Sequence, residues 1–282
     1  MYTPKTWSNS FYAPSEASLY VKEQLKAIRA ELIKNKHSCI VVVTFLAFAL
    51  APLMGGVFML IMRNPEAMAK AGGLQAKVQL MNFTANWESY FEILKQAMGV
   101  GGILIFGFVA SWIFGREYSD STAKDLLALP TSRTKILNAK FMVYTLWCLA
   151  LALFNLILGS LIGVLLQLPA PATKLLFTPL TDYFITTGLT ILLGTPIAFF
   201  AIWGKGYLAP LGFVCLALVF AQIIAAAGYG YYFPWSVPGL FSGAGGAYKA
   251  QLNSISYGIV LLTGIAGYLA TITYWKYADQ TK

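Results

Sequence analysis

Charged side chains are scarce in this sequence of 282 residues. They make up 11% of the chain, whereas a soluble domain carries roughly 25%, and 58% of the residues are hydrophobic. The apolar residues gather in runs of about 20, the length that a helix needs to cross roughly 30 Å of hydrocarbon. This composition excludes an ordinary soluble protein and predicts an all-α polytopic membrane protein.

Cysteine and histidine are also rare. Cys39, Cys148 and Cys215 stand alone in separate apolar runs, and the chain has one histidine. Without CxxC spacing or paired histidines, the sequence offers neither a disulfide framework nor a zinc site. The GxxxxGK[ST], HExxH and GxSxG signatures are missing as well. We therefore predict no catalytic, cofactor-binding or metal site, so any ATP hydrolysis would belong to another protein.

The sequence does contain six apolar runs, which we interpret as membrane spans within a single domain over 1–282. The first begins after some 37 mostly polar residues, too late for a cleaved signal peptide, so it should remain as an anchor. Pro196 and Pro210 are expected to bend the fourth and fifth spans, which are joined by a tight turn. The predicted spans are 39–62, 97–115, 141–167, 183–203, 207–228 and 255–275.

Lysine and arginine are distributed unevenly between the two sides of these spans. Six lie in the first 37 residues, five in 116–140, one in the turn after Gly204 and two in the tail, a total of 14 on one side. The alternate connections hold 6. Because basic residues favour the cytoplasmic side, we expect both termini in the cytoplasm, with the chain in the cell inner membrane. The net charge of +9 therefore indicates topology and not nucleic-acid binding.

Residues 15–36, before the first span, have the pattern of an amphipathic helix. Val21, Leu25, Ile28 and Leu32 repeat at spacings of four, three and four. A basic helix of this kind can lie along the inner membrane surface. The alternative is a helix that packs on a partner protein.

The segment 229–254 is apolar and aromatic but rich in glycine and proline. A continuous helix cannot form there, and irregular backbone at membrane depth is tolerated only against protein or a wet cavity. We expect a re-entrant or interfacial element on the outer face. A simple loop in the aromatic belt of the membrane is the alternative.

The loop 116–140 is the most informative part of the chain. Leu126 and Leu127 belong to a short predicted helix that Pro130 must end, and a second helix follows. Apolar side chains on a polar loop must be shielded from water, and a partner protein or the chain's own helix ends could shield them. Candidate caps are Asp120 or Ser121 for the first helix and Thr131 or Ser132 for the second.

This loop resembles the cytoplasmic coupling segment of ABC-type exporter permeases, in the six-span group that includes bacitracin-permease-like proteins. Ser121 stands where that family usually has glycine. The order of features along nearly the whole chain is similar too, from the entry helix to the outer element. The residues that carry the resemblance are Arg116, Glu117, Tyr118, Thr122, Leu126, Leu127, Pro130, Arg133 and Lys140.

The resemblance implies partners and contact sites. A permease homodimer, or a pair with a related permease, would bind two ATPase subunits that hold ATP and Mg²⁺, and the loop would fit a groove on each ATPase. Separately, because glycine and proline forbid a seventh span in 229–254 and its aromatic residues cannot be fully exposed, we expect this segment to close the outer end of the dimer. Its gate would be made by Tyr232, Phe233 and Trp235. The residues expected to contact the ATPase are Glu117, Thr122, Leu126, Leu127, Pro130 and Arg133.

Two other classes of function are open at this point. An ion-coupled carrier or channel usually buries charges in its spans, whereas these spans show only scattered polar residues such as Asn155, Gln167 and Gln222. A membrane enzyme or scaffold without transport activity would not need the exposed leucines. For an exporter, the apolar spans suit a hydrophobic or amphipathic substrate such as a peptide antibiotic or a lipid.

Overall fold

The computed structural model describes residues 16–36, 38–70, 83–122, 131–169 and 177–277. These residues are mainly helical and include no strand, which confirms the predicted all-α class. Leu126, Leu127 and Pro130 lie outside the described residues.

Six helical stretches are long and apolar enough to cross a membrane, as predicted. They are α2 (Cys39–Arg63), α5–η1–α6 (Trp87–Gln96, Ala97–Gly101 and Gly102–Ser119), α8 (Arg133–Leu165), α9–α10 (Phe177–Leu192 and Gly194–Trp203), α11 (Leu208–Ala226) and α13 (Ser254–Tyr277). The other helices are α1 (Glu16–Lys36), α3 (Pro65–Lys70), η3 (Gly230–Tyr232), η4 (Pro234–Ser236), α12 (Val237–Phe241) and η5 (Gly246–Gln251).

The second span is longer than predicted because it begins at Trp87 instead of residue 97. Asn86 starts it, since its side chain accepts a hydrogen bond from the Ser89 backbone N–H at 2.9 Å. Tyr90 and Leu94 are fully buried, so this part of the chain is core and not an interfacial anchor. The Tyr90 hydroxyl donates to the Pro52 carbonyl at 2.9 Å, which fixes α5 against α2.

The two prolines expected to bend spans have different effects. Pro196 lies in the first turn of α10, directly after the break between α9 and α10. In a continuous helix, the ring of Pro196 would clash with the carbonyl group four residues earlier, so the span is interrupted there. Pro210 lies in the first turn of α11, where the missing N–H has no helical partner to lose, so that helix continues without interruption.

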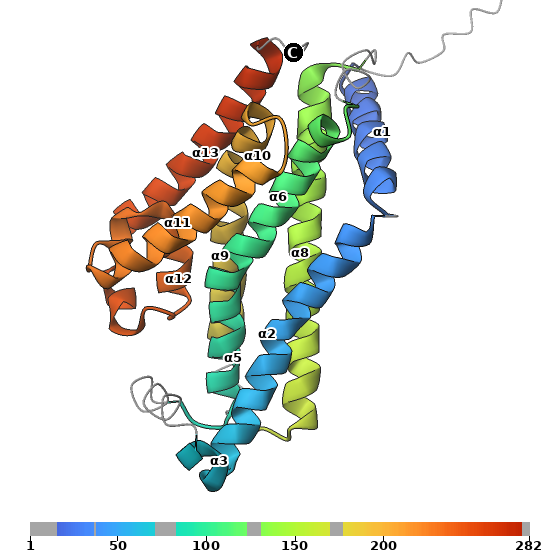
Figure 1. The fold of residues 1–282 in the computed structure, drawn as a ribbon. Helices are drawn as coiled ribbons and strands as arrows, with labels where there is room; N and C mark the ends of the chain where they lie inside the picture. The colour runs from blue at the N-terminus through green and yellow to red at the C-terminus, as the bar shows by residue number, and fades with distance from the viewer. Residues whose placement is uncertain (1–15, 37, 71–82, 123–130, 170–176, 278–282) are drawn as a thin grey trace, which may run out of the picture.

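The bundle has two distinct ends. Figure 1 shows α1, the end of α6, the start of α8, the α10–α11 turn and the end of α13 together at the top, and α3 at the bottom. We call these the α1 end and the α3 end. Helix α6 is central, because it packs against α2, α8, α9, α10 and α11. The outward faces of α2, α8, α11 and α13 carry exposed leucine, isoleucine and valine side chains, as expected for contact with lipid.

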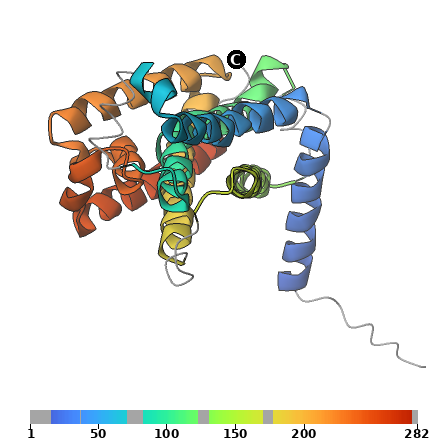
Figure 2. The same cartoon turned by 90° about the horizontal axis from the view of Figure 1, so that it is seen from below.

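Helix α1 confirms the predicted helix before the first span. In Figure 2, where α8 is seen end-on, α1 is seen lengthwise, so it crosses the direction of that span. Val21, Leu25 and Leu32 point outward and are exposed, whereas Ile28 packs against the core. The side of α1 that faces the protein is mainly polar, with Glu31 and Asn35 buried. The exposed side mixes these apolar side chains with Lys22, Lys26 and Arg29, so the membrane surface and a partner protein both stay open for α1.

The segment from Gly230 to Gln251 forms four short helices instead of a seventh span. In Figure 1, α12 lies level with α9 and well above α3, so the segment folds back toward the middle of the bundle. Helix α12 packs against η1 and α9. The segment is therefore helical and packed against the bundle, as a re-entrant element requires, while its depth in the membrane stays a prediction. We call Gly230–Gln251 the re-entrant segment.

Candidate coupling and gate sites

The two ends of the predicted coupling loop are placed by α6 and α8. Ser132 starts α8, as its hydroxyl accepts a hydrogen bond from the Lys135 backbone N–H at 3.4 Å. Of the two candidate caps, Ser132 is thus the one used. Thr122 is exposed just beyond α6, and its backbone N–H donates to the Glu117 carbonyl at 2.9 Å.

Ser121 has a left-handed backbone, with φ of 58°. L-residues pay a steric cost in this conformation, whereas glycine does not. This turn would explain the glycine that the resemblance implies at this position.

Glu117 is not on the surface of the loop. Its side chain is only 2% exposed and accepts a hydrogen bond from Lys140 Nζ at 2.8 Å, and Lys34 also pairs with it. Lys140, 3% exposed, further contacts a Glu31 carboxylate oxygen at 3.3 Å and donates to the Ile113 carbonyl at 3.2 Å. We call Glu31, Lys34, Glu117 and Lys140 the ionic junction.

The ionic junction joins three helices, since its members come from α1, α6 and α8. Two carboxylates face two ammonium groups, so the charges balance. A buried charge is stable only when its partners and hydrogen bonds are in place, which restricts the geometry of all three helices. The prediction that Glu117 contacts an ATPase is untested, and this geometry indicates that it positions helices instead. Sequence reasoning missed Glu31 and Lys34.

Arg133 joins the start of α8 to the end of α13. Its guanidinium donates to the backbone carbonyls of Trp275 at 3.4 Å and Lys276 at 3.3 Å. A cation at the last carbonyls of a helix is favourable because those groups lack helical partners. Arg133 remains exposed on its outer side, where a partner could still contact it.

Phe233 and Trp235 of the predicted gate lie together, while Tyr232 points outward. The ring centroids of Phe233 and Trp235 are 5.7 Å apart, and Trp235 meets Phe213 of α11 edge-on at 5.3 Å. Tyr232 is 52% exposed. These contacts fix the re-entrant segment to α11, and they leave Tyr232 available to another surface.

Helix α12 rests directly on η1, a π-helical turn within the second span. A Cβ atom on Gly99 would lie 2.5 Å from the Pro238 carbonyl oxygen and 2.6 Å from Ser242 Oγ, so only glycine permits this approach. Such π-turns are frequent at functional sites.

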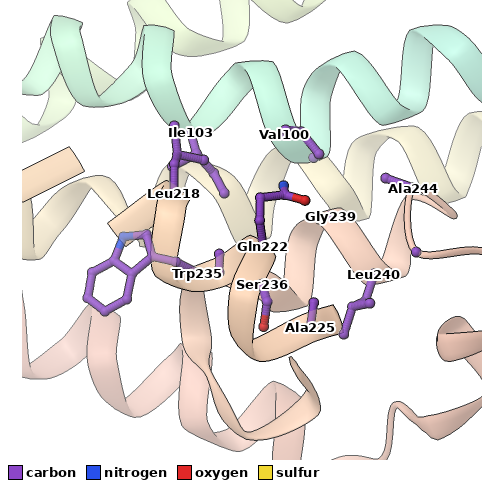
Figure 3. A pocket seen from close by; sticks show the side chains of 13 residues that line it. Val100, Ile103, Leu218, Gln222, Ala225, Trp235, Ser236, Gly239, Leu240 and Ala244 are labelled. Carbon is purple, nitrogen blue, oxygen red and sulfur yellow. The ribbon is translucent and has the colours of Figure 1, made fainter. Parts of the chain in front are cut away.

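A small cavity lies beneath this contact, between η1, α6, α11 and α12. It has a volume of about 60 Å³, room for a few water molecules and not for a peptide. Figure 3 shows Gln222 of α11 reaching toward Val100 across it, with Trp235 beside it. The cavity thus lies directly beside Trp235 of the predicted gate.

A cluster of ion pairs lies beside the predicted gate. Lys95, 3% exposed, lies 2.6 Å from a Glu92 oxygen and 3.5 Å from Asp182, and Lys249 of η5 lies 3.2 Å from Asp182. These groups join the outer segment to α5 and α9. Sequence reasoning missed them because Lys95 was assigned to a loop.

Residues 27–223, more than half of the chain, match the family model described as ABC-2 family transporter protein. The chain belongs to this family. It is also 28% identical over 178 residues to the bacitracin transport permease protein BCRB of Bacillus licheniformis, covering 63% of this chain and 85% of that protein. The resemblance to ABC-type permeases is thereby confirmed, while the coupling role of the loop stays a prediction.

As an ABC-2 permease, the chain is a multi-pass membrane subunit that associates with an ABC ATPase. This assignment sets aside the ion-coupled carrier, the channel and the enzyme or scaffold. Within the ranges that the structure describes, no group of His, Cys, Asp or Glu could hold a metal ion.

Proposed function

We propose that this permease exports a hydrophobic or amphipathic substrate, such as a peptide antibiotic or a lipid, as a dimer with two ATPase subunits. The relative named for bacitracin transport supports a peptide or lipid-like substrate. The ratio of 14 to 6 basic residues supports a cytoplasmic α1 end and an outer α3 end. ATP and Mg²⁺ would bind to the ATPase.

The observation that carries the proposal is the continuity of the second span. It contains Glu117 of the ionic junction at one end and Gly99 of the gate contact in its middle. Eighteen residues separate these positions, about 27 Å at 1.5 Å per residue. A force applied near Glu117 can therefore reach α12 through a single helix.

The coupling step would begin at the loop between α6 and α8. Leu126 and Leu127 would enter an apolar pocket of the ATPase, with Thr122, Pro130 and Arg133 beside them. Each buried leucine would stabilise the complex by roughly 1.5 to 3 kcal/mol. Closure of the two ATPases around ATP would move α6 and α8 together, because the ionic junction joins them.

The outward step would take place at the gate. A shift of η1 removes the surface on which α12 rests, so the re-entrant segment can move and the small cavity beneath it can widen. Tyr232, exposed on the same segment, would contact the second permease across the dimer. The substrate would leave on that side.

The experiment that tests this proposal replaces Leu126 and Leu127 together by Asp. The variant should insert and fold normally but lose the copurifying ATPase and substrate export. The control replaces Ala250 and Gln251, an adjacent exposed pair at the opposite end, by Asp. Stoichiometric ATPase and normal export in the leucine variant would refute the coupling role of the loop.

A further inference from the structure

An apolar groove lies at the α1 end. It is formed by α1, α2 and α8 and has a volume of about 410 Å³. Ile33, Phe45, Leu146 and Trp147 line it. Ile33 and Leu146 are exposed, so the groove presents an uncovered apolar surface to the membrane.

The polar groups of the groove lie at one end. They are Asn35 and Lys36, in the last turn of α1. The side-chain amide of Asn35 already has a hydrogen-bond partner, because it donates to the Glu31 carbonyl at 2.9 Å. Lys36 is exposed and makes no ion pair with any described residue. The ammonium group of Lys36 is thus the available cation of the apolar groove.

We infer that this groove binds an anionic phospholipid of the cytoplasmic leaflet, with one acyl chain between α1, α2 and α8 and the phosphate on Lys36. Charge complementarity selects this occupant, since a basic side chain at the membrane surface attracts anionic lipid. The apolar lining supplies the contact for the chain. A zwitterionic lipid would fit the groove, but Lys36 would contribute less to its binding free energy.

The groove and the ionic junction are neighbours on α1 and α8. Leu32, Ile33 and Lys36 line the groove, whereas Glu31 pairs with Lys140, and Asn35 links the two because it lines the groove and donates to the Glu31 carbonyl. A lipid in the groove would therefore affect the position of α1 at the junction. Its binding does not depend on the proposed export function, but its expected effect on ATPase coupling does.

Binding is tested on the purified full-length permease by native mass spectrometry, with phosphatidylglycerol and phosphatidylcholine of identical chains as probes. Wild type should retain phosphatidylglycerol preferentially. Lys36→Ala should weaken its retention about fivefold, the effect of one basic residue at a membrane surface. Lys22→Ala, about 21 Å away along the same helix, is the control and should retain it fully.

The apolar groove is tested by filling it with a larger side chain. Leu146→Trp should exclude the lipid, whereas Leu153→Trp, two turns along the same helix, should not. Both leucines are 46% exposed, and only Leu146 lines the groove. Equal retention of the two lipids by wild type, or an unaffected Leu146→Trp variant, would overturn the inference. Cross-linking of a Leu146→Cys variant to a second permease or to the ATPase would also overturn it, since protein would then cover the groove.

The effect on coupling is measured separately, in vesicles that contain the permease and its ATPase. Phosphatidylglycerol should raise ATP hydrolysis in wild type and not in Leu146→Trp. Retention of lipid without this rise would refute the regulatory effect and leave the site established. Absence of any associated ATPase would refute the proposed function alone.

Discussion

The two ends of this permease are built from different interactions. At the α1 end, buried charges from three helices meet in the ionic junction. At the gate, α12 lies against η1 through close backbone contact, and Trp235 of the same segment packs on Phe213 of α11. The ion cluster there combines the buried Lys95 with the partly exposed Asp182 and Lys249. Buried ion pairs have one favourable geometry, whereas apolar contacts tolerate sliding. The first end suits force transmission, and the second suits opening.

The largest expected effect comes from removing a charge of the ionic junction. Lys140→Met leaves Glu117 and Glu31 without their shared partner in a buried site, so the free energy of unfolding should fall by about 3 to 5 kcal/mol. Equilibrium unfolding in detergent micelles measures this loss. Adding Glu117→Gln should restore part of it, because the double variant buries fewer unpaired charges.

Lys249→Met is the matched control at the other end. Lys249 is 41% exposed, so its ion pair with Asp182 should contribute at most about 1 kcal/mol. Equal losses in the Lys140 and Lys249 variants would remove the distinction between the two ends.

A methyl group at the gate contact should have the next largest effect. Gly99→Ala forces a carbon into the space of the Pro238 carbonyl, which should destabilise the permease by about 1 to 3 kcal/mol. We expect export to fail while the ATPase still copurifies. Gly101→Ala, in the same π-turn with open space around its Cβ, is the control and should export normally. Similar export by both variants would show that α12 does not depend on this contact.

At the end of α6 we expect a smaller change in the free energy of unfolding, and of opposite sign. Ser121→Gly removes the steric cost of the left-handed residue and should stabilise the permease by about 0.5 to 1 kcal/mol. Thermal unfolding in detergent detects this change. Ser119→Gly, in the last helical position of α6, should instead destabilise the permease, and a gain in that variant would contradict the explanation.

The smallest effect concerns an exposed ion pair of α1. Lys135 donates a hydrogen bond to Glu23 and, with its charge, lowers the pKa of Glu23 below the ordinary value of 4.5. The pair therefore contributes stability above about pH 4.5, and this contribution is lost as the pH falls through the lowered pKa.

Hydrogen exchange of α1 across this range measures the change. Protection should be constant from neutral pH down to about 4.5 and then decrease. Glu23→Gln should lack the acid step contributed by this pair. A step of equal size in that variant would assign the acid sensitivity to other groups.

Several parts of the fold could be predicted because they depend on local properties of the chain. A bilayer of fixed thickness requires runs of about 20 apolar residues, so the six spans were readable from hydropathy. Glycine and proline in 229–254 forbid a continuous helix, and Ser132 can cap the helix that follows it. The family was also visible in the residues themselves.

The sequence by itself determined the class, the spans and the family of this protein, while the tertiary structure decided how its parts act on one another. Glu117 was read as a surface residue, yet packing places it beside Lys140 and Lys34, which are 23 and 83 positions away. Helical periodicity gives the face on which a side chain lies but not the helix that it meets. The contact between Gly99 and Pro238 is likewise set by two segments that meet only in the folded bundle.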